Sequence, residues 1–237
     1  MALLEIENLS VNYGKVRALS NATLQVEAGK VIGLIGPNGS GKSTLLDTVS
    51  GLTTDWRGKI TYDGLDLSKL KPAERVNMGV VQCPERRHLF PLMTVKDNLV
   101  IGSFCKNARP MIDENMEFVF NVFPVLKEKQ NAYANTLSGG QAQMLAVGRS
   151  ILSNPKLLML DEPMLGVAPV LRKAFSIALE RLKEKNITIL ITEQELFLTI
   201  NSTDMLYTIT MGKIADKGTS EEFQLSSSMN DLYFMNK

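Results

Sequence analysis

Alternating apolar and polar positions open the chain and predict β-strands over residues 3–9 and 22–26. Residues 59–64 have the composition of a further strand ending in a turn, and a short apolar strand over 78–83 is closed by Pro84. After Lys30, the stretch to residue 35 is apolar throughout, as expected for a strand that is buried on both faces. The first third of the chain is therefore predicted to be rich in strands.

The pattern changes to helical spacing over residues 94–153, where apolar residues recur at intervals of three and four. Thr94 followed by Asp97 resembles a helix-capping pair. Met116, Phe120 and Phe123 fall on one helical stripe, which we interpret as core packing. We expect a helical lobe over about residues 91–153, inserted into a sheet lobe formed by about residues 1–90 and 154–218.

Buried strands return in the last third, over residues 156–160 and 186–191, with a helix predicted between them over 169–185. Such alternation favours an α/β fold with a mostly parallel sheet covered on both faces. A hairpin is expected at Met211-Gly212, and short helices over 219–237. The whole chain, residues 1–237, is predicted to be one domain.

The composition argues against several classes of protein. The net charge of +1 predicts no bulk attraction to nucleic acid, and we expect no nucleic-acid partner. Cys83 and Cys105 lack metal-ligand spacing and are expected to be reduced thiols in a cytosolic protein. The N-terminus lacks the basic region of a secretory signal, and no apolar run reaches the ~18 residues that span a bilayer. At a membrane, another chain would supply the spanning part.

A phosphate-binding loop is the strongest single motif. Residues 36–43 read GPNGSGKS and match the pattern G-x-x-x-x-G-K-[ST], between a predicted strand and a predicted helix over 44–49. Glycines allow backbone N–H groups to surround phosphate oxygens, and the helix N-terminus adds further donors. Lys42 is expected to reach the β- and γ-phosphates, and the Ser43 hydroxyl to ligate Mg²⁺. The chain is therefore predicted to bind ATP or a similar nucleoside triphosphate.

The apolar strand over 156–160 ends in Asp161-Glu162, which supplies the remaining catalytic groups. An aspartate at the carboxyl end of this strand can hold Mg²⁺, usually through water. The adjacent Glu162 can act as the general base that activates the attacking water.

Residues 137–141 read LSGGQ and precede a helical run over 142–152, between the two nucleotide motifs. This order resembles the ATP-binding-cassette (ABC) ATPases, a branch of the P-loop NTPases, over nearly the whole chain. The resemblance implies a sheet core with an N-terminal antiparallel portion. It also implies that two cassettes enclose two ATP molecules head to tail. One chain's signature segment would then contact the γ-phosphate held by the other; its residues are Ser138, Gly139, Gly140 and Gln141.

The same resemblance implies further nucleotide contacts. Tyr13 falls where the family places an aromatic ring against adenine. The residues that would surround the phosphates are Gly36, Pro37, Asn38, Gly39, Ser40, Gly41, Lys42, Ser43 and Thr44.

Three positions depart from the common family pattern. The family usually has a glutamine, in the context Val-Pro-Gln, that approaches Mg²⁺ and the attacking water. Matching this proline to Pro84 puts Glu85 at the glutamine's position, and Gln82 lies three residues upstream. We favour Glu85 as a catalytic and metal-binding residue and keep Gln82 as the alternative. Gln194 occupies the place of a histidine that contacts the γ-phosphate, and Ala168 that of an aspartate linking the two sites.

These departures resemble the ATPase subunits of branched-chain amino acid importers, of the smaller, LivF-like type. That resemblance implies two membrane-spanning permeases, a second ABC ATPase subunit and, indirectly, an extracytoplasmic solute-binding protein as partners. The chain would lie peripherally on the cytoplasmic face of the membrane, with ATP and Mg²⁺ as its ligands. Importers of urea, other amides or other amino acids remain alternatives. Less favoured are an ABC ATPase of repair or translation, and a P-loop kinase or GTPase.

Overall fold

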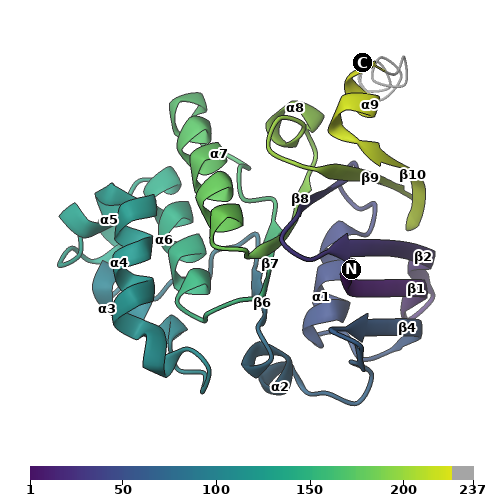
Figure 1. The fold of residues 1–237 in the computed structure, drawn as a ribbon, viewed down its shortest axis with the longest axis horizontal. Coiled ribbons are helices and arrows are strands. Elements are labelled where there is room, and N and C mark those ends of the chain that lie inside the picture. The colour runs from purple at the N-terminus through teal and green to yellow at the C-terminus, as the bar shows by residue number, and fades with distance from the viewer. Residues whose placement is uncertain (226–237) are drawn as a thin grey trace.

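A computed structural model describes residues 1–225, except for the side chains of residues 169, 170, 197 and 198. Two sheets and a group of helices make up this part of the chain (Figure 1). The first sheet has the strand order β2-β1-β4-β5 and is antiparallel. Its strands are β1 (Ala2–Tyr13), β2 (Val16–Glu27), β4 (Trp56–Tyr62) and β5 (Leu65–Asp66).

The second sheet has the order β10-β9-β3-β8-β7-β6, and only β10 runs antiparallel to its neighbour. Its strands are β3 (Val31–Ile35), β6 (Val80–Cys83), β7 (Leu157–Asp161), β8 (Thr188–Glu193), β9 (Met205–Thr210) and β10 (Lys213–Thr219). The β3, β7 and β8 strands are buried throughout, as expected for parallel strands covered on both faces. This confirms the predicted α/β fold.

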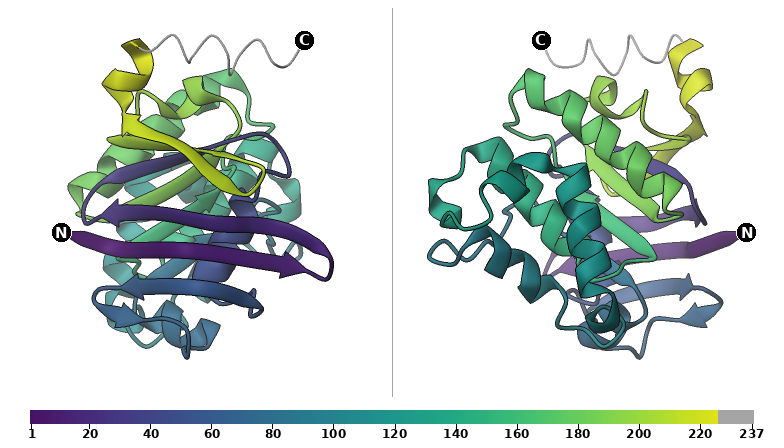
Figure 2. Two further views of the ribbon diagram at one scale, coloured as in Figure 1. Left: turned by 90° about the vertical axis from the view of Figure 1, so that its right-hand side faces the viewer. Right: turned by 60° about the vertical axis from the view of Figure 1, so that its left-hand side comes forward.

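Helices lie on both faces of the second sheet. The α1 helix (Lys42–Ser50) packs through Leu45, Leu46 and Val49 into the core shared with the first sheet. The other face carries α7 (Pro169–Glu184) and α6 (Gly139–Ile151). The helices α3 (Val95–Gly102), α4 (Ile112–Val122) and α5 (Pro124–Glu128) pack onto α6, and all of them share one hydrophobic core. Figure 2 shows the antiparallel sheet at one end of the molecule and the α3–α6 helices at the opposite end.

Shorter helices complete the fold: α2 (Pro72–Asn77), α8 (Leu196–Thr199), α9 (Ser220–Leu225), and two 3-10 turns over Arg109–Met111 and Ala134–Thr136. The α2 helix was not predicted, because six residues are too few for a periodic signal. Its buried Arg75 donates hydrogen bonds to the carbonyls of residues 48, 49, 67 and 70, which fixes the turn that follows α1. None of the helices within residues 1–225 is long and apolar enough to cross a bilayer.

Predicted boundaries differ mainly in the first sheet. The β1 and β2 strands extend well beyond the predicted 3–9 and 22–26, because register irregularities between residues 2 and 12 interrupt the alternation that the prediction used. The hairpin at Met211-Gly212 and the helix over 169–185 are confirmed. Thr94 caps α3 by accepting a hydrogen bond from the Asp97 amide. Of the predicted C-terminal helices, α9 is present, and residues 226–237 lie outside the described part.

Candidate active site

A cavity of about 380 Å³ opens where the phosphate loop meets the carboxyl end of β7. It is lined by Ala18, Asn38, Gly39, Gly41, Lys42, Ser43, Thr44, Glu85 and Glu162. All but Ala18 were predicted to act on the nucleotide. The fold therefore brings together, in one place, residues that are more than a hundred positions apart in sequence.

The phosphate loop runs from the end of β3 at Ile35 to the start of α1 at Lys42. A Cβ atom at Gly36 would lie 2.3 Å from the Ile209 carbonyl oxygen, so only glycine fits there. Gly41 has a φ of 108° and no room beside Leu19. The buried Ser40 hydroxyl has no hydrogen-bond partner within the described chain, which leaves a polar atom to be satisfied at the phosphate site.

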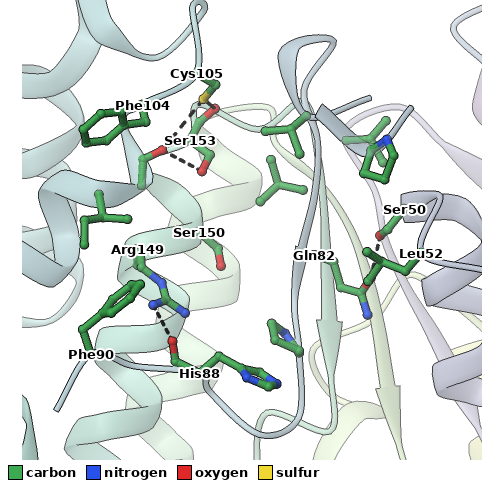
Figure 3. Close-up of a pocket in the computed structure, with 17 residues that line it drawn as sticks. Ser50, Leu52, Gln82, His88, Phe90, Phe104, Cys105, Arg149, Ser150 and Ser153 are labelled. Carbon is green, nitrogen blue, oxygen red and sulfur yellow. Dashed lines mark hydrogen bonds between the residues drawn. The ribbon is translucent and has the colours of Figure 1, made fainter. Parts of the chain in front are cut away.

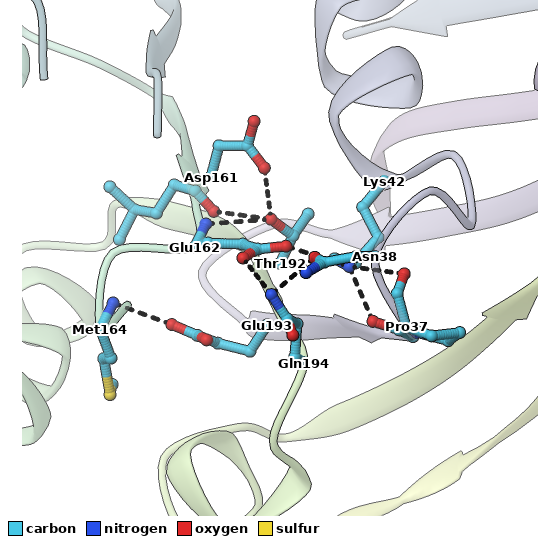
Figure 4. A network of polar contacts seen from close by, with 11 residues as sticks. Pro37, Asn38, Lys42, Asp161, Glu162, Met164, Thr192, Glu193 and Gln194 are labelled. Carbon is cyan, nitrogen blue, oxygen red and sulfur yellow. Dashed lines mark hydrogen bonds and ion pairs between the residues drawn. The ribbon is translucent and has the colours of Figure 1, made fainter. Parts of the chain in front are cut away.

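Lys42 and Glu162 form a buried ion pair at the base of this loop (Figure 4). The Lys42 ammonium lies 3.0 Å from Glu162 Oε1 and donates to the carbonyls of Gly36 (2.7 Å) and Pro37 (3.1 Å). The two side chains are only 3% and 7% exposed. A phosphate that binds Lys42 must therefore compete with Glu162, and would release that carboxylate for other contacts.

Asp161 and Ser43 lie beside this pair. The Thr192 hydroxyl donates to Asp161 Oδ1 at 2.7 Å, and Ser43 hydrogen-bonds the same side chain. Burial raises the pKa of Asp161, while the two hydrogen bonds act to lower it. The structure thus places a hydroxyl and a carboxylate together at the position where the sequence predicted Mg²⁺ ligands.

Gln194 links Glu162 to the phosphate loop. Its Nε2 donates to Glu162 Oε2 at 2.8 Å and to Asn38 Oδ1 at 2.6 Å (Figure 4). Gln194 follows directly after β8, which lies between β3 and β7 in the sheet. This order brings the amide into contact with the Glu162 carboxylate and with the phosphate loop.

Glu85 and Gln82 are the two candidates for the position where the family usually has a glutamine near Mg²⁺, and they lie in different surroundings. Glu85 is exposed and lines the cavity. Gln82 instead faces α1, where its Nε2 donates to Asp47 at 2.9 Å and its Oε1 accepts from Ser50 at 2.5 Å. The geometry favours Glu85 over Gln82 as the residue that faces a bound nucleotide.

Not every predicted residue lines the cavity. Gly36, Pro37, Ser40, Asp161 and Gln194 belong to the loop and the contacts described above, and two further groups are Tyr13 and the signature segment. Tyr13 is half exposed, and its hydroxyl lies 3.1 Å from Thr53 Oγ1. The signature segment begins α6 on the other lobe, where the Ser138 hydroxyl accepts from the Gln141 amide and Gln141 Oε1 accepts from the Ser138 amide. Gly140 packs so closely against Leu171 that a Cβ would lie 2.3 Å from its Cδ1. Within one chain, the signature segment is therefore not part of the phosphate cavity.

Sequence reasoning missed three residues of the site: Ala18, Thr192 and Glu193. The Ala18 position carries no chemical signal. Thr192 and Glu193 were visible as polar residues ending an apolar strand. The fully buried Glu193 accepts a hydrogen bond from the Met164 amide at 2.9 Å. Burial, with a smaller contribution from the Glu162 charge, raises the pKa of Glu193 from 4.5 to about 7.

Glu193→Gln is expected to change how stability depends on pH. Because the pKa of Glu193 is higher in the folded chain, its contribution favours folding at low pH and is lost as pH rises from 4.5 to about 7. At pH 8 the variant should unfold at higher urea concentrations than the parent. Its free energy of unfolding should be larger by at most about 3 kcal/mol. At pH 5 the two should converge. Urea titrations from pH 5 to 8 test this, and parallel pH profiles would contradict it.

The sequence is similar to a known protein family and to several known relatives. The ABC transporter family model matches residues 19–165. The branched-chain amino acid transport ATP-binding protein BraG of Pseudomonas aeruginosa is 35% identical over 98% of this chain and 99% of its own. A probable LivG of Methanocaldococcus jannaschii is 36% identical over 94% and 91%, and a probable LivF of Archaeoglobus fulgidus is 29% identical over 93% of each.

Solved structures of similar fold belong to the same family. The ADP conformation of an ATP-binding cassette of an ABC transporter superposes with a TM-score of 0.85 at 29% identity, covering 100% of both chains. A nucleotide-free cassette gives a TM-score of 0.82 at 28% identity over 99% of each chain. Taken with the phosphate loop, the buried Lys42–Glu162 pair and the LSGGQ segment, these matches show that the chain belongs to the ABC transporter family, as an ATP-binding subunit that hydrolyses ATP.

Proposed function

We propose that this chain is the energising subunit of an importer of branched-chain amino acids, and that it hydrolyses ATP at Glu162. One observation carries the catalytic part: Lys42 and Gln194 both contact Glu162, which lines the phosphate cavity. The importer part is supported by relatives named as branched-chain amino acid transport proteins, which match nearly the whole chain. The solute would not touch this subunit, so its identity rests on those relatives.

In this proposal each side chain has a separate role in ATP binding or hydrolysis. Lys42 binds the β- and γ-phosphates, assisted by backbone N–H groups of the loop over residues 38–44, and Tyr13 packs against adenine. Glu162 orients the attacking water and accepts its proton. Gln194 holds Glu162 and can donate a hydrogen bond to the γ-phosphate, but it cannot exchange a proton at neutral pH.

Mg²⁺ fits the donors that the site offers. The hard oxygen ligands would be Ser43, Asp161 and Glu85. Within residues 1–225 no cluster of three or more His, Cys, Asp or Glu side chains forms a cage of its own. Mg²⁺ is commonly bound by one or two carboxylates together with nucleotide phosphates. When bound, the ion would neutralise charge that develops on the phosphate oxygens.

A second cassette would complete the site. Ser138, Gly139, Gly140 and Gln141 begin α6 away from their own chain's cavity, and a helix N-terminus with free amides can bind an anion. We propose that they bind the γ-phosphate held by a second ABC ATPase subunit. The single domain of residues 1–237, with its sheet lobe and its helical lobe over about 91–153, would then close and open as ATP is bound and hydrolysed.

A groove between the lobes is the proposed permease contact. It has a volume of about 500 Å³ and is mainly apolar, with Phe90 and Phe104 on one side and Leu52 on the other (Figure 3). Leu92 lies close by in sequence and is 78% exposed. Exposed apolar residues of this kind suit an apolar segment of a membrane protein. Docking there would place the chain peripherally at the cytoplasmic face of the membrane.

The loop over residues 84–91 connects this groove to the ATP cavity. Glu85 lines the cavity and Phe90 lines the groove. Arg149 of α6 donates to the carbonyls of Arg87 and His88, both at 2.7 Å. A change at Glu85 on ATP binding can therefore be passed to the groove through a loop that is fixed to α6.

Leu92→Asp is expected to lower solute uptake at least about tenfold while leaving ATP affinity unchanged, because a charge on the contact surface must be desolvated on docking. The matched control is Leu65→Asp, which places the same charge at an exposed leucine of β5 in the antiparallel sheet. Uptake by cells or proteoliposomes that carry the whole transporter is the measurement. Unchanged uptake with Leu92→Asp, or an equal loss with Leu65→Asp, would contradict this contact surface.

A further inference from the structure

Glu193 is a buried carboxylate that the proposed reaction does not yet use. It ends β8, and only 2% of it is exposed. Its backbone carbonyl accepts a hydrogen bond from the Gly36 amide at 3.2 Å, at the start of the phosphate loop. Its Oε1 accepts one from the Met164 amide at 2.9 Å (Figure 4). Glu193 therefore joins the phosphate loop to the segment that follows Glu162.

Glu162 needs such support because its backbone is strained. Its φ is 45°, in the left-handed region that non-glycine residues rarely adopt. Such a conformation costs about 1–3 kcal/mol and persists only where neighbouring contacts impose it. On the N-terminal side, the Glu162 amide donates to the Thr192 carbonyl at 3.1 Å and lies 3.2 Å from the Thr192 hydroxyl.

The contact on the C-terminal side depends on Glu193. Pro163 has no N–H group, so the Met164 amide is the first backbone donor after Glu162. Met164 is buried, and an unpaired amide there would be costly. The acceptor that satisfies it is the Glu193 carboxylate. Without this acceptor, the segment from 163 to 165 would have to shift, and the Glu162 side chain would move with it.

We propose that Glu193 is a positioning residue for ATP hydrolysis: its side-chain oxygen holds the Met164 amide and thereby fixes Glu162 toward the phosphate cavity. The inference rests on the assignment of Glu162 as the general base. The role requires an oxygen acceptor and not a negative charge. The raised pKa of Glu193 agrees with this, because the neutral carboxyl group keeps an acceptor oxygen.

A matched pair of variants tests the role in the full-length chain. Glu193→Met keeps the approximate length of the side chain and removes the acceptor, whereas Glu193→Gln keeps an acceptor oxygen and removes the charge. With Glu193→Met we expect kcat to fall about 10- to 100-fold, with the Kd of a fluorescent ATP analogue within about threefold of the parent. Glu193→Gln should restore kcat to within about threefold. Amide exchange of the peptide that contains Met164 should be faster only in Glu193→Met.

Parental turnover by Glu193→Met, or equal losses with both variants, would overturn the proposal. If Glu193→Met does not fold, Glu193→Asp decides, because it withdraws the acceptor by one methylene. Its kcat should fall at least about tenfold, and parental turnover would overturn the proposal. Glu162→Gln is measured in parallel. Full turnover by that variant would refute the assignment of the base, whereas the exchange rate at Met164 still reports whether Glu193 holds the segment.

Discussion

Glu162→Gln is expected to lower kcat for ATP hydrolysis by about 10²- to 10⁴-fold, the usual contribution of a general base. Glutamine has nearly the same shape and can still contact Lys42 and Gln194, which lie within hydrogen-bond distance of the carboxylate. It cannot accept a proton from water near neutral pH. Because the ion pair with Lys42 is removed, ATP should bind at least as tightly as to the parent chain.

Single-turnover hydrolysis and equilibrium binding of ATP separate these two effects. The control is Glu180→Gln, which makes the same change at an exposed position of α7. Parental kcat in Glu162→Gln would show that the base lies elsewhere. A loss of ATP affinity with unchanged kcat would show that Glu162 contributes to binding and not to the chemical step.

Lys42→Ala is expected to weaken ATP binding at least about 100-fold, which corresponds to about 2.7 kcal/mol. The ammonium group is buried beneath the phosphate loop and is held toward it by the carbonyls of Gly36 and Pro37. Its removal takes away the charge-assisted hydrogen bonds to the phosphates. It also leaves the buried Glu162 carboxylate without its partner, so the free energy of unfolding should fall.

The double variant Lys42→Ala with Glu162→Gln separates binding from stability. It removes both charges, and should recover stability relative to Lys42→Ala while ATP binding stays weak. The control is Lys59→Ala, which breaks an exposed pair with Glu7 and should change neither quantity measurably. Calorimetric titration with ATP and urea unfolding are the two measurements. Near-parental ATP affinity of Lys42→Ala would contradict the assigned role.

The sequence predicted those parts of the site whose chemistry is local. The phosphate loop and Asp161-Glu162 are contiguous motifs at strand ends, and parallel strands bring their carboxyl ends to one edge. Contacts between distant residues were not predictable. The hydrogen bond from the Met164 amide to the Glu193 carboxylate joins the segment after β7 to the end of β8, 29 positions apart in sequence. The sequence already favoured Glu85 over Gln82 through the match on Pro84, but it did not show that Asp47 and Ser50 of α1 hold the Gln82 side chain.

In the fold, too, local sequence patterns predicted some elements correctly, and features that depend on pairing between distant residues were missed. Continuous apolar runs correctly predicted β3, β7 and β8, because strands buried on both faces need no alternation. The ends of β1 and β2 were wrong, since register irregularities change which residues face the core. For the signature segment, the resemblance implied a contact with the nucleotide of another chain, and in the structure none of its residues lines its own chain's phosphate cavity.

The most direct test of the proposed function is to isolate the tagged chain from native membranes with a mild detergent and identify the proteins that co-purify. The account predicts two multi-span permeases and a second ABC ATPase subunit, which together bind a solute-binding protein specific for branched-chain amino acids. ATP hydrolysis by this assembly should be stimulated by that loaded binding protein. Recovery of the active ATPase without any membrane protein would contradict the importer function.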